Sequence, residues 1–363
     1  MDLESEFDDA VAFGLIPAAD NASALIDVLS GIPYSFVLSF AFTLAKPYLS
    51  RDDRAFYVID NPVKKDIVTG LPYVAATSWK GAFRRAALRA EFEFGDKKWQ
   101  EDVNGGRAFR RAHRDLFGHE QGAEGKHKDF AEYLDGLTGT DEHAGESRRG
   151  RLLFYPSFFQ KLGIEVINKR NRETGAGTFP IYFECVPAGE PATFTLVYVP
   201  FDLVGKNKLE VRRAVSRDLK TVAATLPELL LTSGVGAKTA EDYGLAEDKL
   251  ADDGKPGFWG NWPAPGPVAI LDEFKPFLND DGTVKEEYRG ESGGCLSNSE
   301  FSNRFPGVHR KPFEGFKKWY KANATAAQGA AEGNVRLERS GVEELSAALK
   351  DAAESLSGNE GEK

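Results

Sequence analysis

The hydrophobic pattern begins with a strand followed by a helix. From Ser35 to Leu49 the segment SFVLSFAFTLAKPYL alternates apolar with small or polar residues, and its aromatic and β-branched content favours a strand. A helical period follows over 77–95, where Gly95 ends it. Its apolar positions recur at helical spacing, at Trp79, Phe83, Ala86 or Ala87, and Ala90.

Further strands and a second helix are predicted downstream. Residues 151–168 and 179–200 have the composition of strands, and Pro187-Ala188-Gly189 is a turn signal within the second stretch. Residues 208–231 have a helical period, which Pro227 is expected to kink or end. The order strand, helix, strands, helix predicts an α+β fold, a ferredoxin-like (RRM-like) sandwich of the split βαβ type.

The remaining segments enlarge this sandwich. Its core is expected over 35–247, after an acidic N-terminal segment over 1–34. Residues 96–150 are polar and rich in glycine, and they are too long for a loop of a compact sandwich, so they predict an inserted, lid-like subdomain. A C-terminal extension is expected over 248–346. The tail, 347–363, is poor in bulky apolar residues and is predicted to be frayed or disordered after a short helix.

Composition limits the class of protein. With 41% hydrophobic and 28% charged residues, the 363-residue chain is neither wholly disordered nor collagen-like. Its formal net charge of −10 argues against a surface uniformly coated for nucleic acid. The charge is uneven, however: residues 61–95 contain six basic and three acidic residues, and residues 151–172 contain five basic and one acidic. Two basic islands therefore remain as candidate contacts for an anionic partner.

Cysteine usage and the N-terminus indicate the compartment. Cys185 and Cys295 cannot form a framework of disulfides and lack metal-ligand spacing, which predicts a reducing environment. The first residues, MDLESEFDDA, are acidic rather than basic, and no apolar run approaches the ~18 residues that span a bilayer. We expect a soluble, cytoplasmic protein that does not bind membranes.

The first candidate site lies in FYVIDNPVKKDIVTGLPYVAATSWKGAFRRAALRAEF, residues 56–92. An Asp60-Asn61-Pro62 turn follows a short apolar strand, and a Ser or Thr N-cap is predicted to open a basic helix. The helix start and its cationic side chains are predicted to share one surface that binds a phosphate backbone. That surface would consist of Ser78, Lys80, Arg84, Arg85 and Arg89. The alternative is an ordinary solvated basic face.

Two further stretches could contact the same kind of partner. The segment INKRNRETGAG predicts a projecting hairpin whose basic tip touches a polyanion. The basic residues of this tip are Lys169, Arg170 and Arg172. In SGVGAKTAEDYGLAE, Gly234 and Gly236 allow close backbone approach and Lys238 supplies charge. The second stretch is not a Walker loop, because the Gly-Lys-Ser/Thr order is absent.

These three motifs, in this order, resemble the RAMP superfamily of CRISPR effector subunits. DNPVKKDIVTGLPYVAATSWKGAFR is similar to the aspartate loop and helix-opening signature of the type III backbone (Cas seven-type) subunits. NKRNRETGAG followed by FECVPAG resembles their thumb hairpin, here over 160–185, and SGVGAKTAEDYGLAE resembles their C-terminal glycine-rich loop. The resemblance covers Ser35 to Glu247.

The resemblance implies a backbone subunit of a type III-like CRISPR ribonucleoprotein effector complex. Its implied partners are CRISPR guide RNA, complementary target RNA and other RAMP subunits, with basic patches on the RNA backbone and base pairing supplying specificity. Asp60 matches the aspartate that carries metal-dependent cleavage of target RNA in that family. Asp60 is therefore implied as the catalytic residue and as a ligand of Mg²⁺ or another divalent cation, and no organic cofactor is expected.

Several alternatives stay open. Asp60 could instead cap its own turn through an Asx hydrogen bond to the backbone near Pro62, and the chain would then be a non-catalytic capping or bridging RAMP subunit. A free-standing RNA-binding protein fits poorly with the acidic balance. His113, His119 and His127 match no standard metal site, so no metal is expected there. A guide-processing nuclease would need a histidine base, and the core motifs contain none.

Overall fold

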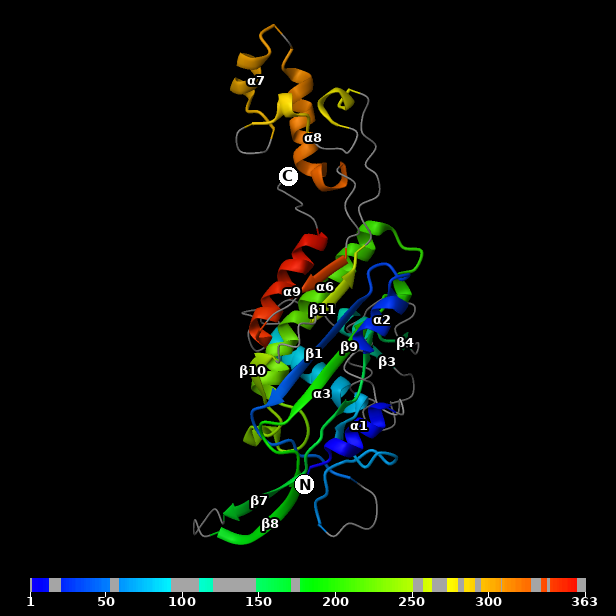
Figure 1. Ribbon diagram of the computed structural model, residues 1–363, viewed down its shortest axis with the longest axis vertical. Coiled ribbons are helices and arrows are strands. Elements are labelled where there is room, and N and C mark those ends of the chain that lie inside the picture. Colours follow the sequence, from blue (N-terminus) through cyan, green and yellow to red (C-terminus); the bar gives the residue numbers. More distant parts are fainter. Residues whose placement is uncertain are drawn as a thin grey trace. The chain divides into compact units, whose positions relative to one another are not determined.

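The computed structural model describes residues 2–12, 21–52, 59–92, 111–119, 148–170, 177–250, 257–262, 273–279, 284–290, 295–307, 309–327, 334–337 and 340–357. The chain divides into two compact units. The first consists of Met1–Gly260 and Val335–Lys363, and the second of Asn261–Asn334. Figure 1 shows the elements of both units.

The first unit is built on a sheet with the order β12-β11-β1-β9-β5, in which β10 also pairs with β1. Strand β1 is antiparallel to β9, β10 and β11, and β5 is antiparallel to β9. The strands are β1 (Phe36–Leu44), β5 (Leu152–Phe154), β9 (Pro191–Tyr198), β10 (Ala246–Leu250), β11 (Phe258–Asn261) and β12 (Asn334–Leu337).

Two helices complete the predicted topology, α3 (Ala76–Phe92) and α6 (Lys208–Pro227). In chain order the elements run β1, α3, β5, β9, α6, β10, and the four strands lie in the spatial order β10-β1-β9-β5. This arrangement is the ferredoxin-like α+β sandwich, and the predicted fold class is confirmed. Helix α6 ends at Pro227, as predicted, and the chain continues as a π-helix, η3 (Glu228–Ser233).

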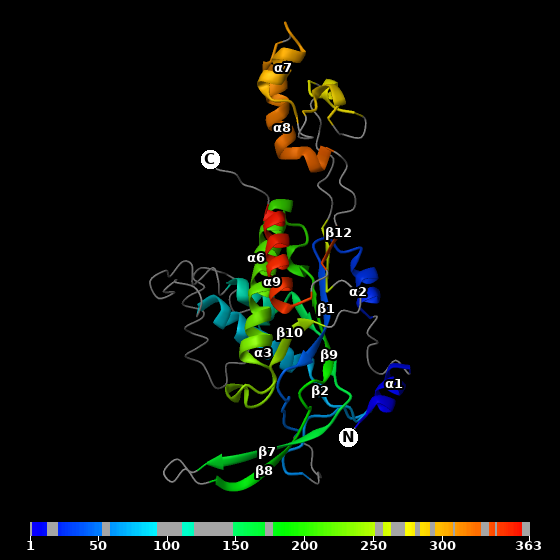
Figure 2. The ribbon, with the colours of Figure 1, turned by 60° about the vertical axis from the view of Figure 1, so that its left-hand side comes forward.

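Helices α3, α6 and α9 (Val342–Ser357) lie together on one side of the sheet (Figure 2). The core beneath α3 is aromatic: the Trp79 ring meets Phe42 of β1 edge-on at 5.9 Å and Phe194 of β9 at 5.0 Å between centroids. Helix α2 (Asn21–Leu29) packs on β1 through a second cluster, in which Leu29 meets Val37. The alternation that predicted β1 thus follows burial: Leu38, Phe40, Phe42 and Leu44 are buried, whereas the residues between them are half-buried.

A two-stranded hairpin projects from one end of this unit (Figure 2). It consists of β7 (Gly163–Arg170) and β8 (Gly177–Cys185), and it matches the hairpin predicted over 160–185. The turn that joins β8 to β9 contains Gly189 at φ +83°, in agreement with the predicted turn. Other short pairs are β2 (Tyr73–Val74) with β6 (Ser157–Phe158), and β3 (Gly118–His119) with β4 (Arg148–Arg149).

Helix α1 (Glu4–Ala12) packs beside the base of the hairpin. Leu3 and Ala10 form a small buried cluster with Leu71. The amide of Leu3 donates to the carbonyl oxygen of Gln160 at 2.7 Å. The acidic segment that opens the chain is therefore attached to the first unit.

The prediction of a disordered tail from residue 347 is wrong. Helix α9 continues to Ser357, and its Leu345, Leu349 and Leu356 are buried. It packs against α6 at close range, since Ser346 Oγ donates to Ala223 O and Ser216 Oγ donates to Ala353 O, both at 2.6 Å. Alanine and serine side chains are small enough for two helices to approach closely, so few bulky residues were needed to bury this helix. Residues 358–363 lie outside the described part.

The predicted extension, 248–346, is divided between the two units. Strands β11 and β12 belong to the sheet of the first unit, whereas Asn261–Asn334 forms the second unit. The second unit has its own aromatic core, made by Phe274, Phe277, Leu278, Val284, Leu296, Phe301, Phe313 and Phe316. Its elements are η5 (Lys275–Phe277), η6 (Glu286–Tyr288), α7 (Asn298–Arg304) and α8 (Lys311–Ala327), and a Ser297–Glu300 capping box opens α7.

The predicted insertion, 96–150, lies mostly outside the described residues. Residues 111–117 are helical, and Phe117 packs on Phe83 of α3 with ring centroids 6.2 Å apart. Helix α3 is described as far as Phe92, and its predicted end at Gly95 lies outside the described residues. Among the described helices, none is both long and apolar enough to cross a bilayer.

Candidate nucleic-acid interface

The loop that carries Asp60, residues 59–66 (the Asp60 loop), is attached to the hairpin strand β8. The side-chain Nδ2 of Asn61 donates to the carbonyl oxygen of Tyr182 at 3.2 Å. The carbonyl oxygen of Asn61 accepts from the amide of Glu184 at 2.9 Å. The residue next to Asp60 is therefore paired with the hairpin.

The Glu184 carboxylate holds the following part of the same loop. Its Oε2 accepts from the amide of Val63 at 3.1 Å and from Lys65 Nζ at 2.6 Å. The Lys65 and Glu184 side chains are only 17% and 15% exposed, so water screens this ion pair weakly. Backbone and side chain of β8 thus both fix the Asp60 loop.

The Asp60 carboxylate itself is exposed. Among the described residues, no group lies within hydrogen-bond distance of it. The proposed Asx turn is not formed, because Pro62 has no amide hydrogen and the next amide, that of Val63, donates to Glu184 instead. Within the described part of the chain, the Asp60 oxygens remain available to a ligand.

A second aspartate in the same segment does play the capping role. Asp66 Oδ1 accepts from the amides of Val68 and Thr69 at 3.0 and 2.9 Å, and from Thr69 Oγ1 at 3.1 Å. These bonds close the turn before Gly70, whose φ is +72°. The Asx-type contact expected as the alternative role of Asp60 therefore belongs to Asp66.

The glycine-rich loop holds the other face of the hairpin. Tyr243 OH donates to Glu165 Oε1 of β7 at 3.1 Å, and Lys238 Nζ lies 5.5 Å from the centroid of the Phe183 ring on β8. Glu165 and Phe183 are cross-strand partners, whereas Glu184, the next residue along β8, points to the opposite face. The Asp60 loop thus pairs with the edge of β8 and with the Glu184 side chain on one face, and the glycine-rich loop contacts the other face.

The predicted RNA-contacting glycines are required by the chain itself. Gly236 has φ +100°, and a Cβ there would collide with Leu49 O. Gly234 has φ +68°, and a Cβ there would lie 2.6 Å from Tyr243 O. The close backbone approach that the sequence indicated is an approach to other parts of this loop and to the segment after β1.

Helix α3 begins two or three residues earlier than a cap at Thr77 or Ser78 predicts. It starts at Ala76, and the carbonyl oxygen of Ala75 accepts from the amides of Ser78 and Trp79. Ser78 therefore stands exposed in the first helical turn and is not the N-cap residue. Its position near the helix start is as expected, but its capping role is not.

The basic residues of α3 form two pairs. At about 100° per residue, Lys80 and Arg84 lie about 40° apart, as do Arg85 and Arg89, on opposite edges of the solvent-facing arc. The prediction that all four share one face is wrong. Lys80 and Arg84 are neighbours by this spacing, and burial together with the charge of Arg84 lowers the pKa of Lys80. Arg89 instead donates to Ser233 Oγ of η3 at 3.0 Å.

The basic tip of the hairpin is described only in part. Lys169 and Arg170 end β7, but their side chains, like the whole of Arg172, lie outside the described part of the structure. The described strands do show a feature that sequence reasoning missed: several large apolar side chains are exposed, with Phe179 90% exposed. The alternation of β7 and β8 placed apolar residues on both faces of a two-stranded ribbon, and that pattern was the available signal.

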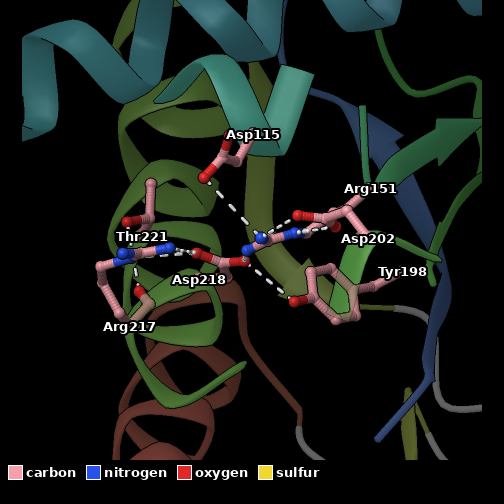
Figure 3. A network of polar contacts seen from close by, with 7 residues as sticks. All are labelled: Asp115, Arg151, Tyr198, Asp202, Arg217, Asp218 and Thr221. Carbon is pink, nitrogen blue, oxygen red and sulfur yellow. Dashed lines mark hydrogen bonds and ion pairs between the residues drawn. The ribbon is translucent and has the colours of Figure 1, made fainter. Parts of the chain in front are cut away.

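One predicted contributor to the basic islands is buried. Arg151 is 3% exposed, and its guanidinium bridges two aspartates (Figure 3): Nε and Nη2 donate to Asp202 at 2.7 and 2.6 Å, and Nη1 donates to Asp218 at 2.6 Å. Tyr198 OH also donates to Asp218, at 2.9 Å. Burial opposes the positive charge, but the two carboxylates outweigh it and raise the pKa of Arg151. Arg151 is therefore a scaffold residue.

His113 and Cys185 of this unit are buried and have structural roles. Burial, together with the nearby Arg84, lowers the pKa of His113 to about 4, and its ring packs on Phe117. Burial beside Glu165 and Glu184 raises the pKa of Cys185 to about 11. Both Cys185 and Cys295 are free thiols. The described residues contain no cluster of three or more His, Cys, Asp or Glu that could hold a metal, while His127 and His143 lie outside them.

The decisive comparison concerns the first unit. The family model of the RAMP superfamily matches residues 27–247. The chain belongs to the RAMP superfamily. The matched range of this RAMP protein begins within α2, ends in β10, and contains the Asp60 loop, the hairpin and the glycine-rich loop.

Solved structures add a distant likeness. A chain from a structure titled "Cryo-EM structure of the Type III-B Cmr-beta bound to cognate target RNA" matches with a TM-score of 0.38 and 14% identity. The match covers 63% of this RAMP protein and 63% of that chain. The search against curated proteins finds no relative.

Proposed function

We propose that this RAMP protein is a backbone subunit of a type III-like CRISPR ribonucleoprotein effector complex. In this role it binds guide RNA through its basic surface and cleaves the paired target RNA at Asp60. Its partners are the guide RNA, the complementary target RNA and other RAMP subunits. Membership of the RAMP superfamily and the type III motifs of the sequence support this assignment.

The observation that carries the proposal is the state of Asp60. Its carboxylate is exposed and has no partner among the described residues. The loop that carries it is bonded to β8 by backbone and side-chain hydrogen bonds. Structural aspartates in turns are normally occupied, as Asp66 is. A rigidly held, unoccupied carboxylate suits a group that meets a substrate.

A divalent cation fits this arrangement only together with RNA. Mg²⁺ is commonly held by one or two carboxylates plus substrate phosphates and water, and Asp60 supplies one carboxylate. When bound, such an ion supplies charge neutralisation at the scissile phosphate. The role of the chain is to hold Asp60 at the target backbone, while the hairpin and the basic side chains fix the strand around it.

The RNA-binding surface is proposed to contact backbone rather than base edges. Lys64 is exposed in the Asp60 loop, and Lys80 and Arg84 form one basic pair on α3. Lys238 lies against the hairpin strand β8. Cationic side chains distributed in this way suit a sequence-blind grip on phosphates, with base pairing left to read the target.

The test is to replace Asp60 in the assembled, guide-loaded complex. Asp60→Ala and the isosteric Asp60→Asn should lower target cleavage at saturating Mg²⁺ by at least about 100-fold, because the carboxylate acts on the reacting strand. Target affinity should change little, because the basic side chains, and not Asp60, bind the RNA phosphates. A matched control is Asp27→Asn, an exposed carboxylate on α2, which should cleave normally. Cleavage by Asp60→Ala at the wild-type rate would remove Asp60 from the active site.

A second candidate is a non-catalytic subunit that caps or bridges the complex. It is favoured by the lack of any acidic or histidine cluster around Asp60 among the described residues. Copy number separates the two: native mass spectrometry of the purified complex should find several copies of a backbone subunit and one copy of a cap.

A further inference from the structure

We propose that Glu184 is a positioning residue that ties Asp60 to the hairpin, so that cleavage follows the seating of the hairpin on RNA. This inference rests on the proposed role of Asp60 in cleavage. It assigns Glu184 no contact with the reacting strand. Its subject is how the Asp60 loop is held.

The contacts of the loop come from three supports, and one of them is β2, where the Tyr73 amide donates to Lys64 O at 3.2 Å. On the β8 side, Glu184 accepts from Val63 and Lys65 through one oxygen, and its own amide donates to Asn61 O. On the other side, the loop meets the segment that follows β1, where Lys64 N donates to Ser50 Oγ at 2.8 Å. Asn61, the residue next to Asp60, is bonded to β8.

Glu184 is the charged side chain of β8, Gly177–Cys185, and it forms an ion pair with Lys65 of the loop. Its Oε2 joins a backbone amide and an ammonium group at 3.1 and 2.6 Å, in a setting where both partners are mostly shielded from water. Charge-assisted bonds of this kind are roughly twice as strong as neutral ones. Removing the carboxylate leaves a shielded ammonium and a free amide, and the loop gains freedom next to Asp60.

The hairpin supplies the movement that this clamp would transmit. Two strands alone are marginally stable in water. This pair is held at its base by the Asp60 loop, which pairs with the edge of β8, and by Tyr243 on the face opposite Glu184. Any tilt of the hairpin against bound RNA therefore carries Asn61 and Asp60 with it. Because an error of about 1 Å in a reacting group can cost about 100-fold in rate, a loose clamp should slow the chemistry while leaving binding intact.

The test compares three clamp variants in the guide-loaded complex. Glu184→Ala should lower the cleavage rate at saturating target by about 10-fold to 100-fold with little change in target affinity. Glu184→Gln keeps an acceptor for the Val63 amide and should recover most of the rate. Lys65→Met removes the cation alone and should fall between them. Glu165→Gln is the control, since Glu165 bonds Tyr243 on the opposite face of the hairpin and does not touch the Asp60 loop.

A second measurement does not depend on cleavage. Hydrogen exchange of the Val63 amide should quicken in Glu184→Ala and stay close to wild type in Glu184→Gln and Glu165→Gln. If Asp60→Ala cleaves normally, the proposed catalytic role fails, while the exchange data still report on the clamp. If Asp60→Ala is inactive but Glu184→Ala cleaves at the wild-type rate, or if Val63 exchange is unchanged, the positioning role of Glu184 is overturned.

Discussion

Asp60 and Asp66 show how neighbouring residues of one type take different roles. Asp66 is consumed by three hydrogen bonds that close its turn, whereas Asp60 stands before a proline and finds no partner among the described residues. The difference comes from the local backbone: the amide of Val63, which might have served Asp60, donates to Glu184. The Asp60 carboxylate therefore accepts no hydrogen bond, because the nearby backbone amides donate to Glu184 and Asp66.

At the same scale, Arg151 should decide the stability of the first unit. Arg151→Met removes the cation that bridges Asp202 and Asp218, while Asp218 keeps its contacts with Arg217 and Tyr198. We expect a loss of about 3 kcal/mol in the free energy of unfolding. Urea titration measures this as a lower midpoint at constant slope. Arg85→Met, on the exposed side of α3, is the control and should change stability by less than about 0.5 kcal/mol. Equal midpoints for the two variants would contradict the assignment of Arg151 as a scaffold residue.

The elements show which sequence signals were sufficient. Strand β1 and helix α3 were predictable because alternation at Phe36–Leu44 and the spacing of Trp79 and Phe83 each match one period. The same period also places the basic residues of α3 on two sides, because a spacing of five residues turns the helix by about 140°. Contacts between distant segments, such as Glu184 with Lys65, could not be predicted from the sequence because no local pattern encodes them.

Helix α9 is the clearest element that the sequence understated. Its buried face consists of Val342, three leucines, three alanines and Ser346, so small side chains make up half of it even though it packs closely on α6. Leu349→Ala should lower the free energy of unfolding by about 2–5 kcal/mol, because it opens a cavity against α6. Its neighbour Lys350 is exposed, and Lys350→Ala should cost less than about 0.5 kcal/mol. Thermal melting of the two variants would be indistinguishable if this segment were disordered.

For the whole molecule, the net charge of −10 conceals its distribution. Helix α1 exposes Glu4, Glu6, Asp8 and Asp9, whereas α3 exposes Arg84, Arg85 and Arg89. Not every basic residue counted in the sequence is available, since Arg151 is buried and Arg89 bonds η3. An acidic protein can therefore hold a polyanion with the part of its surface that is locally cationic.

The division into two units also has a measurable consequence. The second unit leaves and re-enters the sheet of the first through β11 and β12, which are hydrogen-bonded neighbours. Replacing 261–334 with a short Gly-Ser linker should therefore leave the first unit folded, because closing a short loop between adjacent strands costs little. Circular dichroism and urea unfolding would check this, with deletion of 342–357 as the destabilising control. Loss of cooperative unfolding in the linker variant would contradict independent folding of the first unit.

The buried thiol at the foot of the hairpin has a practical consequence for watching this protein at work. Burial beside two glutamates raises the pKa of Cys185 to about 11, and burial also raises the pKa of Cys295, so neither forms the reactive thiolate readily at neutral pH. A cysteine introduced at the exposed position 179 would outcompete both for a maleimide dye. A Phe179→Cys variant should therefore allow fluorescent labelling of the hairpin at one site while Cys185 and Cys295 are kept.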